Sequence, residues 1–510
     1  MTLGGSVAAS AFGLLVLDGG GSIAANWDEV PLMRHLRRAR PELVLGFASA
    51  LVYAVISLVR HVRFQSGVDL AIFDQALAGY AAGKMPYSDI KALQPFNLLG
   101  DHFSPIIAVL APLYRIWPHV ELLLLAQAAL FGLSVGLVTR IARRSHGALG
   151  SALVGSAFAL SRGLIDAVTF DFHEIAFAVP LLIWAIDSLS RQQIGKAAIA
   201  SGLLMLVKED SAFLLVGIGL WLLFERRSRL GVAWILGGVA SFGLVILVII
   251  PVLSFYGRYT YLDPGSLHTE GLVDSLTAFV VNASHGLVSW NFLVMVVALV
   301  APTMGRALLS PIVLVGVPGI AARLALPQDA SISLGAHYNA TLSAIVFLAA
   351  LDAGRRASRP LRPRAARSSA PGRRAQVWPA TCVALAVATL FLPPPSPLVS
   401  PEAWSCDSCA AAAAAIAVVP DGAEVAADPY VTSHLTDRAR VRLLIPSFTD
   451  SVGDCLAPEY VLANLGSAGI DGLIRRLTAS GAYTMVSRTT PYAVLRAMGP
   501  PKVPVAVCSK

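Results

Sequence analysis

The stretch 194–229, IGKAAIASGLLMLVKEDSAFLLVGIGLWLLFERRSR, decides how the chain is folded. It is apolar except for basic residues at both ends and the charged triplet Lys208, Glu209 and Asp210 in its middle. A single transmembrane helix would hold three charges near the bilayer centre, at a cost of about 2.5–3.5 kcal/mol each. Two short helices, each about 21 Å long, avoid this cost and keep both basic ends on one side. The triplet then forms a tip below the outer surface that faces protein or a wet cavity.

The composition of the whole chain favours a polytopic α-helical membrane protein. Its 510 residues are 56% hydrophobic and only 14% charged, which departs from the averages of soluble domains. A span needs about twenty apolar residues to cross about 30 Å of hydrocarbon. Counting the short pair as two, we predict about eleven spans, at 42–60, 119–141, 147–161, 174–190, 194–207, 212–224, 230–255, 286–302, 307–324, 337–350 and 377–392.

Arginines are concentrated in short loops between these apolar runs. The net charge of +8 would suggest a nucleic-acid partner in a soluble protein, but this distribution indicates membrane topology, and we expect no nucleic-acid partner. The positive-inside rule places the segment before the first span, with Arg40, and the loops that hold Arg140 and Arg226 in the cytoplasm. The densest cluster, at 355–374, is explained more simply by a flexible cytoplasmic linker than by attraction to anionic lipid.

The sequence predicts three parts. Residues 1–41 are a cytoplasmic N-terminal segment. Residues 42–394 are the transmembrane domain, with the first outer loop and its juxtamembrane helices at 61–118 and a basic cytoplasmic loop at 353–376. Residues 395–510, beginning in the breaker LPPPSPLVSPEAW, alternate strands with helices and form an extracytoplasmic α/β domain.

Four cysteines lie in the extracytoplasmic domain: Cys406, Cys409, Cys455 and Cys508. On the outer side of a membrane, cysteines favour disulfides, and the downstream pair lacks the close spacing of a zinc site. We expect two disulfides, with Cys409–Cys455 or Cys406–Cys508 among three possible pairings.

Three polar clusters face outward in this topology. They are the loop 61–103, the stretch DAVTFDFHEIAF at 166–177 and the charged triplet. Later outer loops add tyrosines, histidines and Arg258. Together they predict a site for a polar substrate or an anion, formed by Asp69, Asp74, Asp101, His102, Asp171, His173, Glu174, Lys208, Glu209, Arg258 and His337.

Each cluster also has a structural interpretation. Ser66 and Asp69 fit a capping box that opens an amphipathic helix, so Asp69 is either a functional carboxylate or a cap. Asp74 lies about 140° round that helix and serves another role. The triplet can be an internally satisfied ion pair. The segment 171–174 has the ligand types of a weak metal half-site.

The order of motifs carries a resemblance to known proteins. DLAIFDQ at 69–75, GDHFSP at 100–105, FDFHE at 170–174 and KED at 208–210 are similar to a family of bacterial predicted membrane proteins, domain of unknown function 2079. The same order resembles the GT-C superfamily of membrane glycosyltransferases, especially the protein mannosyltransferase and lipid A aminoarabinose transferase branch. Asp69, Ser104–Pro105 and Lys208 stand at matching places, although Glu209 and Asp210 replace the Gly-Pro that follows the lysine there.

The resemblance implies an inverting glycosyltransferase in the bacterial plasma membrane. Its donor would be a polyprenyl-phosphate sugar and its acceptor a cell-envelope glycan, lipid or protein outside the cytoplasm. An outer-loop carboxylate acts as base and cations stabilise the departing phosphate. We therefore predict Asp69 as base, with Asp74 as fallback, and Lys208 as the phosphate contact. Branches differ in their need for Mg²⁺ or Mn²⁺, for which Asp171, His173 and Glu174 are the candidate ligands.

Two other classes of function stay open. A transporter of a polar or anionic substrate also has charges at short broken helices. Against it, the charges lie at one membrane face, and the two halves of the chain show no visible repeat. A non-catalytic envelope assembly factor would keep the fold without the activity. Asp69→Asn separates an enzyme, which would lose activity, from a scaffold, which would keep its phenotype.

Overall fold

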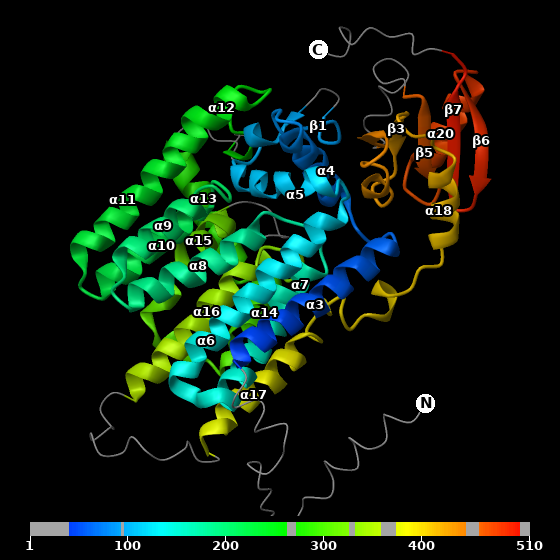
Figure 1. The fold of residues 1–510 in the computed structure, drawn as a ribbon. Coiled ribbons are helices and arrows are strands. Elements are labelled where there is room, and N and C mark those ends of the chain that lie inside the picture. The colour runs from blue at the N-terminus through cyan, green and yellow to red at the C-terminus, as the bar shows by residue number, and fades with distance from the viewer. Residues whose placement is uncertain are drawn as a thin grey trace, which may run out of the picture.

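The structure is a computed structural model that describes residues 40–92, 96–262, 272–325, 332–358, 374–444 and 458–499. A helical part occupies most of the chain, and a separate five-stranded sheet lies beside one end of it (Figure 1). Nearly all of the predicted N-terminal segment, and residues 359–373 of the predicted basic loop, lie outside the described residues.

The helical part contains helices of very different lengths. They are α3 (Pro41–Val62), α4 (Val68–Ala81), α5 (Ala111–Ile116), α6 (Glu121–Ala159), α7 (Arg162–Val168), α8 (Ile175–Ser190), α9 (Ile194–Leu204), α10 (Ser211–Phe224), α11 (Ser228–Leu244), α12 (Ile250–Leu253), α13 (Leu272–Leu287), α14 (Trp290–Val300), α15 (Val317–Ala325), α16 (Ala340–Ala357) and α17 (Arg374–Thr389). Short elements join them: β1 (Tyr87–Ser88), β2 (Phe96–Asn97), the 3-10 turns η2 (Leu98–Gly100), η3 (Pro105–Leu110), η5 (Thr260–Leu262), η6 (Ala301–Thr303), η7 (Arg306–Leu309) and η8 (Pro311–Val315), and the π-helical η4 (Val245–Ile249).

Small residues let α3 and α6 pack closely. A Cβ added at Gly132 would lie 2.5 Å from the Cβ of Ala50 and 2.6 Å from the carbonyl oxygen of Gly46. Gly132 and Gly136 have the GxxxG spacing that lets membrane helices approach each other. α3 therefore lies against α6 with little more than backbone between them.

α6 reverses direction at Gly147. This residue has a φ of 66°, which favours glycine, and the helix is broken there. Gly155 packs against the side chain of Thr139, although sixteen residues of straight helix would separate them by about 24 Å. The predicted spans 119–141 and 147–161 therefore correspond to the two limbs of α6.

The predicted count of eleven spans is not confirmed. By length and composition, three helices among the described residues can cross a membrane: Pro41–Val62, Glu121–Ala159 and Ser228–Leu253. Phe279–Leu287 and Trp290–Thr303, bent by 62°, could together make a fourth. Most of the other predicted spans appear as shorter apolar helices. The predicted span 307–324 is broken into η7, η8 and α15, because Pro311, Gly316 and Pro318 interrupt a continuous helix.

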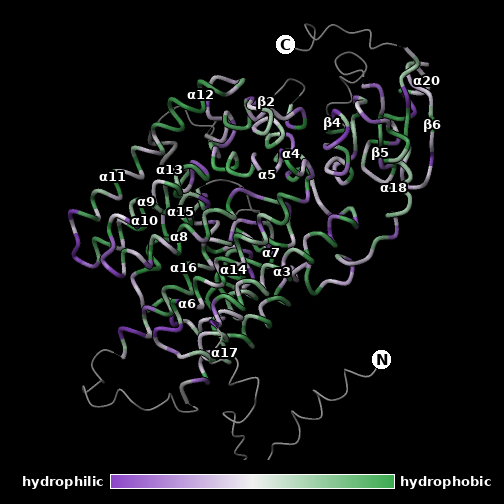
Figure 2. Tube along the Cα trace, viewed as in Figure 1, coloured by the Kyte–Doolittle hydropathy of each residue, from purple (hydrophilic) through white to green (hydrophobic). Residues whose placement is uncertain are grey.

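The two ends of the helical part differ in charge and partner. At the start of α3, Glu42 pairs with Arg143 at 2.9 Å, beside the pair that Arg144 makes with Asp187. At its other end, about 33 Å away by helix rise, His61 stacks on His434 of the sheet domain, with ring centroids 4.0 Å apart. Figure 2 shows hydrophobic residues along the helices and hydrophilic ones in the loops between them and in the sheet domain. We call the end with Arg143 and Arg144 the basic end. We call the end beside the sheet domain the outer end, after the topology that the sequence predicts.

The sheet domain has the strand order β4-β3-β5-β7-β6. Its strands are β3 (Glu424–Ala427), β4 (Arg440–Leu443), β5 (Tyr460–Asn464), β6 (Tyr483–Thr489) and β7 (Tyr492–Ala497), and its helical elements are η10 (Pro401–Ala403), α18 (Cys409–Ala417), η11 (Thr432–His434) and α20 (Ile470–Ala479). β3 pairs in parallel with β4 and β5, whereas β7 pairs antiparallel with β5 and β6. Strands and helices thus follow one another along this part of the chain.

One disulfide joins Cys406 to Cys409. The pairings Cys409–Cys455 and Cys406–Cys508 are therefore wrong, because the two cysteines three residues apart bond to each other at the entry to α18. Cys455 and Cys508 lie outside the described residues, and Cys382 is free and buried in α17.

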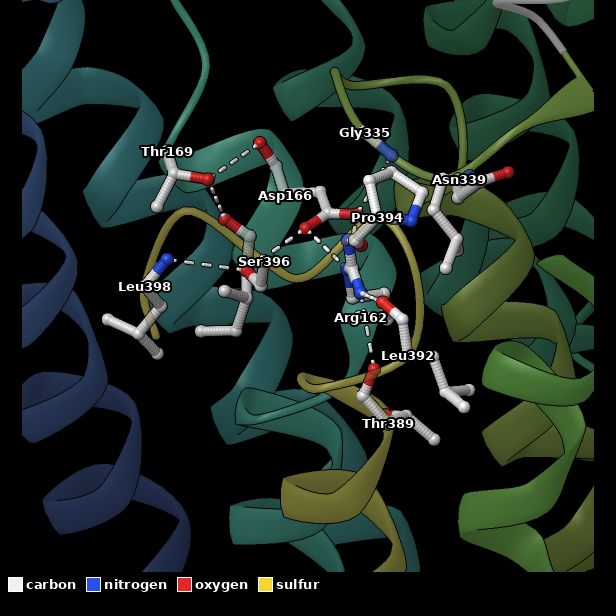
Figure 3. Close-up of polar contacts among 12 residues, drawn as sticks. Arg162, Asp166, Thr169, Gly335, Asn339, Thr389, Leu392, Pro394, Ser396 and Leu398 are labelled. Carbon is white, nitrogen blue, oxygen red and sulfur yellow. Dashed lines mark hydrogen bonds and ion pairs between the residues drawn. The ribbon is translucent and has the colours of Figure 1, made fainter. Parts of the chain in front are cut away.

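A buried ion pair binds the segment that leads from α17 to the sheet domain, here called the linker, to the helical part (Figure 3). Arg162 donates to both carboxylate oxygens of Asp166 at 2.7 Å, and both side chains are buried. Asp166 also accepts from Gly335 N and Ser396 Oγ, and Arg162 donates to the carbonyl oxygens of Thr389, Leu392 and Pro394. Asp166, part of the predicted second polar cluster, is therefore fully used in joining α7 to the chain that leaves α17.

Candidate functional site

The three predicted polar clusters meet at the outer end. The charged triplet lies between α9 and α10, the two short helices that the sequence predicts, and its side chains reach both of the other clusters. Lys208 contacts Glu174 of the second cluster, and Glu209 contacts His102 of the first. A loop conformation at 205–210 makes this possible, because adjacent residues can then point to different partners.

Glu174 is the centre of the first half of the site. It lies at the start of α8 and is 1% exposed. One oxygen lies 3.1 Å from Lys208 Nζ and the other 2.7 Å from His173 Nδ1. Both contacts are ion pairs by distance, and neither Glu174 oxygen has a partner in hydrogen-bond geometry among the described residues.

Glu209 is the centre of the second half. Its Oε1 lies 2.7 Å from His102 Nδ1 and accepts from Tyr259 Oη at 3.0 Å, while Oε2 accepts from Phe103 N at 3.0 Å. Burial raises the pKa of Glu209, but the contacts with His102 and Lys208 outweigh burial and leave the pKa below its usual value. Glu209 is therefore an anchor for the loop 101–103, because its oxygens contact His102, Phe103 N and Tyr259.

Asp101 extends this half toward the outer loop. It pairs with Lys91 and accepts from Tyr261 Oη at 3.2 Å, and the Tyr261 ring stacks on His102 with centroids 4.6 Å apart. Arg258 is exposed on the same segment as Tyr261. Asp263 and His268, in the same predicted outer loop, lie outside the described residues.

Arg323 completes the site, and sequence reasoning missed it. Its Nη2 donates to Tyr338 O at 2.6 Å, and its guanidinium lies over the Tyr338 ring. Its Nη1 is buried and has no hydrogen-bond partner within the described part of the chain. The charges of both Arg323 and Lys208 act on Asp210, which is exposed at the tip. An arginine inside the predicted apolar span 307–324 was the available signal, since such residues are costly in a membrane.

His337 links Arg323 to Glu174. It stacks on His173 with ring centroids 3.4 Å apart and contacts the Tyr338 ring. Its buried Nδ1 has no hydrogen-bond partner among the described residues. Arg323 and His337 thus each carry a buried polar atom without a hydrogen-bond partner among the described residues, and both contact the Tyr338 ring.

Asp69 lies on α4, on the face of the helix that meets the polar region around His173 and His337. It is one helical turn before Phe73, so both lie on one face of α4, and the Phe73 ring contacts His173 with centroids 5.2 Å apart. Asp69 is partly exposed and is not the cap of α4: the N-cap is Gly67, with no capping side chain of its own.

Asp171 caps α4 instead. Its carboxylate accepts from Gly67 N at 2.8 and 2.9 Å and from Leu70 N at 3.4 Å. Burial raises the pKa of Asp171 to about 6, although these N–H groups lower it. The predicted capping box of Ser66 and Asp69 is therefore wrong, because a carboxylate from a distant loop occupies the N-terminus of the helix.

Asp74 is directed away from the site. It is 0% exposed, accepts from Tyr114 Oη at 2.9 Å, and faces the sheet domain near Thr436. The structure does not bring it near Lys208 or Glu174, so the predicted fallback base is outside the polar region.

The candidate metal ligands do not form one ligand set. Asp171 is bonded to α4, whereas His173 and Glu174 contact each other and Lys208. Within the described ranges, no group of three His, Cys, Asp or Glu side chains is arranged to hold a metal ion. The residues at 171–174 therefore do not fit the divalent cation that the sequence allowed.

Comparison with known proteins identifies a family. A family model described as "Predicted membrane protein (DUF2079)" matches residues 60–492. No curated protein matches the chain. Among solved structures, the crystal structure of ArnT from Cupriavidus metallidurans bound to undecaprenyl phosphate is similar, with 16% identity and a TM-score of 0.46, covering 89% of this chain and 97% of that one.

Proposed function

The chain belongs to the DUF2079 family of predicted membrane proteins, and we propose that it is an inverting membrane glycosyltransferase. Its donor would be a polyprenyl-phosphate sugar and its acceptor a cell-envelope glycan, lipid or protein. The observation that carries this proposal is the polar region at the outer end, where Lys208 and the unpartnered Nη1 of Arg323 lie around one exposed carboxylate. The motif order that resembles the GT-C superfamily supports it.

The two cations suit a lipid phosphate. Lys208 has three donors and forms an ion pair with Glu174, and Arg323 has a buried donor that no described residue accepts. Ammonium and guanidinium groups are the usual phosphate partners, and charge-assisted bonds are the strong ones. As the sugar leaves, negative charge develops on the phosphate, and these fixed donors would stabilise it.

Asp69 would act as the general base. It is the partly exposed carboxylate on the α4 face that contacts His173, whereas Glu174, Glu209 and Asp171 are buried and each already has partners. In the proposed step the acceptor hydroxyl loses its proton to Asp69, its oxygen bonds to the anomeric carbon, and the bond from that carbon to the phosphate oxygen breaks. A single displacement of this kind inverts the anomeric centre.

The proposed location is the bacterial plasma membrane, with the outer end and the sheet domain outside the cytoplasm. The arginines at the basic end support this orientation by the positive-inside rule. The disulfide Cys406–Cys409 in the linker to the sheet domain supports an oxidising surrounding on the other side.

The test is the glycan and glycolipid profile of envelope fractions from cells that lack the protein. These cells are complemented with wild type, Asp69→Asn or Asp89→Asn, a matched carboxylate variant in the same outer loop, at equal membrane abundance. We expect one sugar-bearing species to disappear and to return with wild type and Asp89→Asn only. Recovery with Asp69→Asn would remove Asp69 as base, and an unchanged profile would favour the transporter.

A further inference from the structure

A groove on the surface of the helical part leads to the basic end. It has a volume of about 510 Å³ and is almost entirely apolar, with Leu130, Leu133 and Leu137 of α6 along one wall and Trp184 of α8 in another. Leu133 is 53% exposed, so the groove opens toward the surroundings of the helices and is not part of the packed interior. Its size is that of a ligand site, which is usually about 300–1,000 Å³.

Four arginines form a second hollow at the basic end. Arg140, Arg143, Arg144 and Arg191 line about 340 Å³. Arg143 pairs with Glu42 at 2.9 Å and Arg144 with Asp187 at 2.8 Å. Arg140 and Arg191 are exposed, and the structure pairs neither with a carboxylate of the described residues. Two positive charges are therefore left for an anion.

Arg140 belongs to both hollows and makes them one continuous surface. From Leu130 to Arg140 the helix rises about 15 Å. That is half of the hydrocarbon thickness of about 30 Å. The apolar wall therefore has the length of one leaflet, with the cations at its headgroup end.

We propose that the groove and the arginine hollow bind one anionic phospholipid of the cytoplasmic leaflet. Its phosphate would lie between Arg140 and Arg191, and an acyl chain would follow Leu137, Leu133 and Leu130. Basic pockets between membrane helices on the cytoplasmic side are suited to anionic headgroups. A polyprenyl tail from the outer end could fill the apolar part, but its uncharged tip would leave both arginines without a partner. The arginine hollow is separate from the outer end, whereas the apolar groove also reaches Ile106 and Val109 of η3. The proposed occupancy by an anionic phospholipid does not depend on the proposed transfer reaction.

Trp184 gives the proposal a local probe, because brominated acyl chains quench a tryptophan that they touch. The purified full chain is mixed with brominated phosphatidylglycerol or brominated phosphatidylcholine in neutral detergent. The quenching that Trp184→Phe removes is the signal from the groove. We expect phosphatidylglycerol to reach half of this signal at a concentration at least tenfold below that of phosphatidylcholine, since each arginine near a headgroup contributes about fivefold.

Arg140→Gln combined with Arg191→Gln is expected to abolish this preference, and the control Arg229→Gln, an exposed arginine in the first turn of α11, to keep it. Native mass spectrometry of lipids retained by wild type and by the double variant gives a readout that does not need Trp184→Phe. Three results would overturn the proposal: equal quenching by the two lipids in wild type, displacement by inorganic phosphate beyond that by chloride at equal ionic strength, or displacement of phosphatidylglycerol by equimolar polyprenyl phosphate.

Discussion

At the residue scale, Asp74 and Glu174 are both fully buried carboxylates, and their partners give them different roles. Glu174 faces the cation Lys208, whereas Asp74 accepts from the neutral Tyr114 hydroxyl. Burial raises the pKa of Asp74 to about 6, although its bonds to Thr436 and Tyr114 lower it. Asp74 therefore reduces stability once it ionises.

This gives a pH prediction with a definite sign. The folded pKa of Asp74 is above the unfolded one. The stability that its protonated form contributes to folding is therefore fully present below about pH 4, and it is lost as the pH rises through about 6. Asp74→Asn keeps an acceptor for Tyr114 and cannot ionise. We expect its free energy of unfolding relative to wild type to rise by about 1–3 kcal/mol between pH 4 and pH 7.5. Thermal unfolding in detergent at both pH values measures this, and an equal difference at both would contradict it.

The pair Arg162–Asp166 predicts a larger effect. Asp166→Asn leaves a buried guanidinium without its counter-charge, which costs about 3–5 kcal/mol. The double variant Arg162→Met with Asp166→Leu removes both charges and should unfold at a clearly higher temperature than Asp166→Asn. The comparison is made by thermal unfolding in one detergent. If the single variant loses less than about 1 kcal/mol, the pair does not hold the linker as described.

At the element scale, α4 depends on a cap that comes from another loop. Asp171→Ala removes the acceptor of Gly67 N and Leu70 N, so hydrogen exchange at the start of α4 should speed up and stability should fall by about 0.5–2 kcal/mol. Ser66→Ala is the control, since Ser66 bonds to His61 and does not cap α4. Faster exchange in Ser66→Ala than in Asp171→Ala would restore the capping box.

The sequence predicted some elements well and others not at all. The short pair 194–207 and 212–224 appears as α9 and α10 with the charged tip between them, because the cost of buried charge depends only on local sequence. The cap of α4 could not be predicted, since Asp171 lies about a hundred residues away. The interruption of 307–324 was visible in Pro311, Gly316 and Pro318, but apolar character outweighed it in the prediction.

At the scale of the whole molecule, the account requires the two ends to lie on opposite sides of the membrane. Asp421 is exposed in the sheet domain, and Arg229 is exposed in the first turn of α11, in a segment that the sequence assigns to the cytoplasm. A membrane-impermeant thiol reagent applied to spheroplasts should label Asp421→Cys and should label Arg229→Cys only after permeabilisation. The reverse pattern would invert the proposed topology.

The candidate site shows the same division between local and long-range information. Its convergence at one face was predictable, because topology brings the outer loops together. The individual contacts could not be predicted. Asp74 faces the sheet domain, Asp171 caps α4, and Arg323 reaches the site from α15, where no motif marks it. The proposed phosphate contact of the sugar donor therefore rests on Lys208 and Arg323 together, and not on the predicted Lys208 alone.

The most direct test of the central claim is the affinity of the purified full chain for a polyprenyl phosphate, measured beside the uncharged polyprenol. We predict that wild type binds the phosphate at least tenfold more tightly than the alcohol, and that Arg323→Gln and Lys208→Gln each lose about 10–100-fold, the value of a charge-assisted bond. Arg229→Gln, at the basic end, should bind as wild type does. Equal affinity for phosphate and alcohol, or unchanged binding in both outer-end variants, would contradict a phosphate site at Lys208 and Arg323.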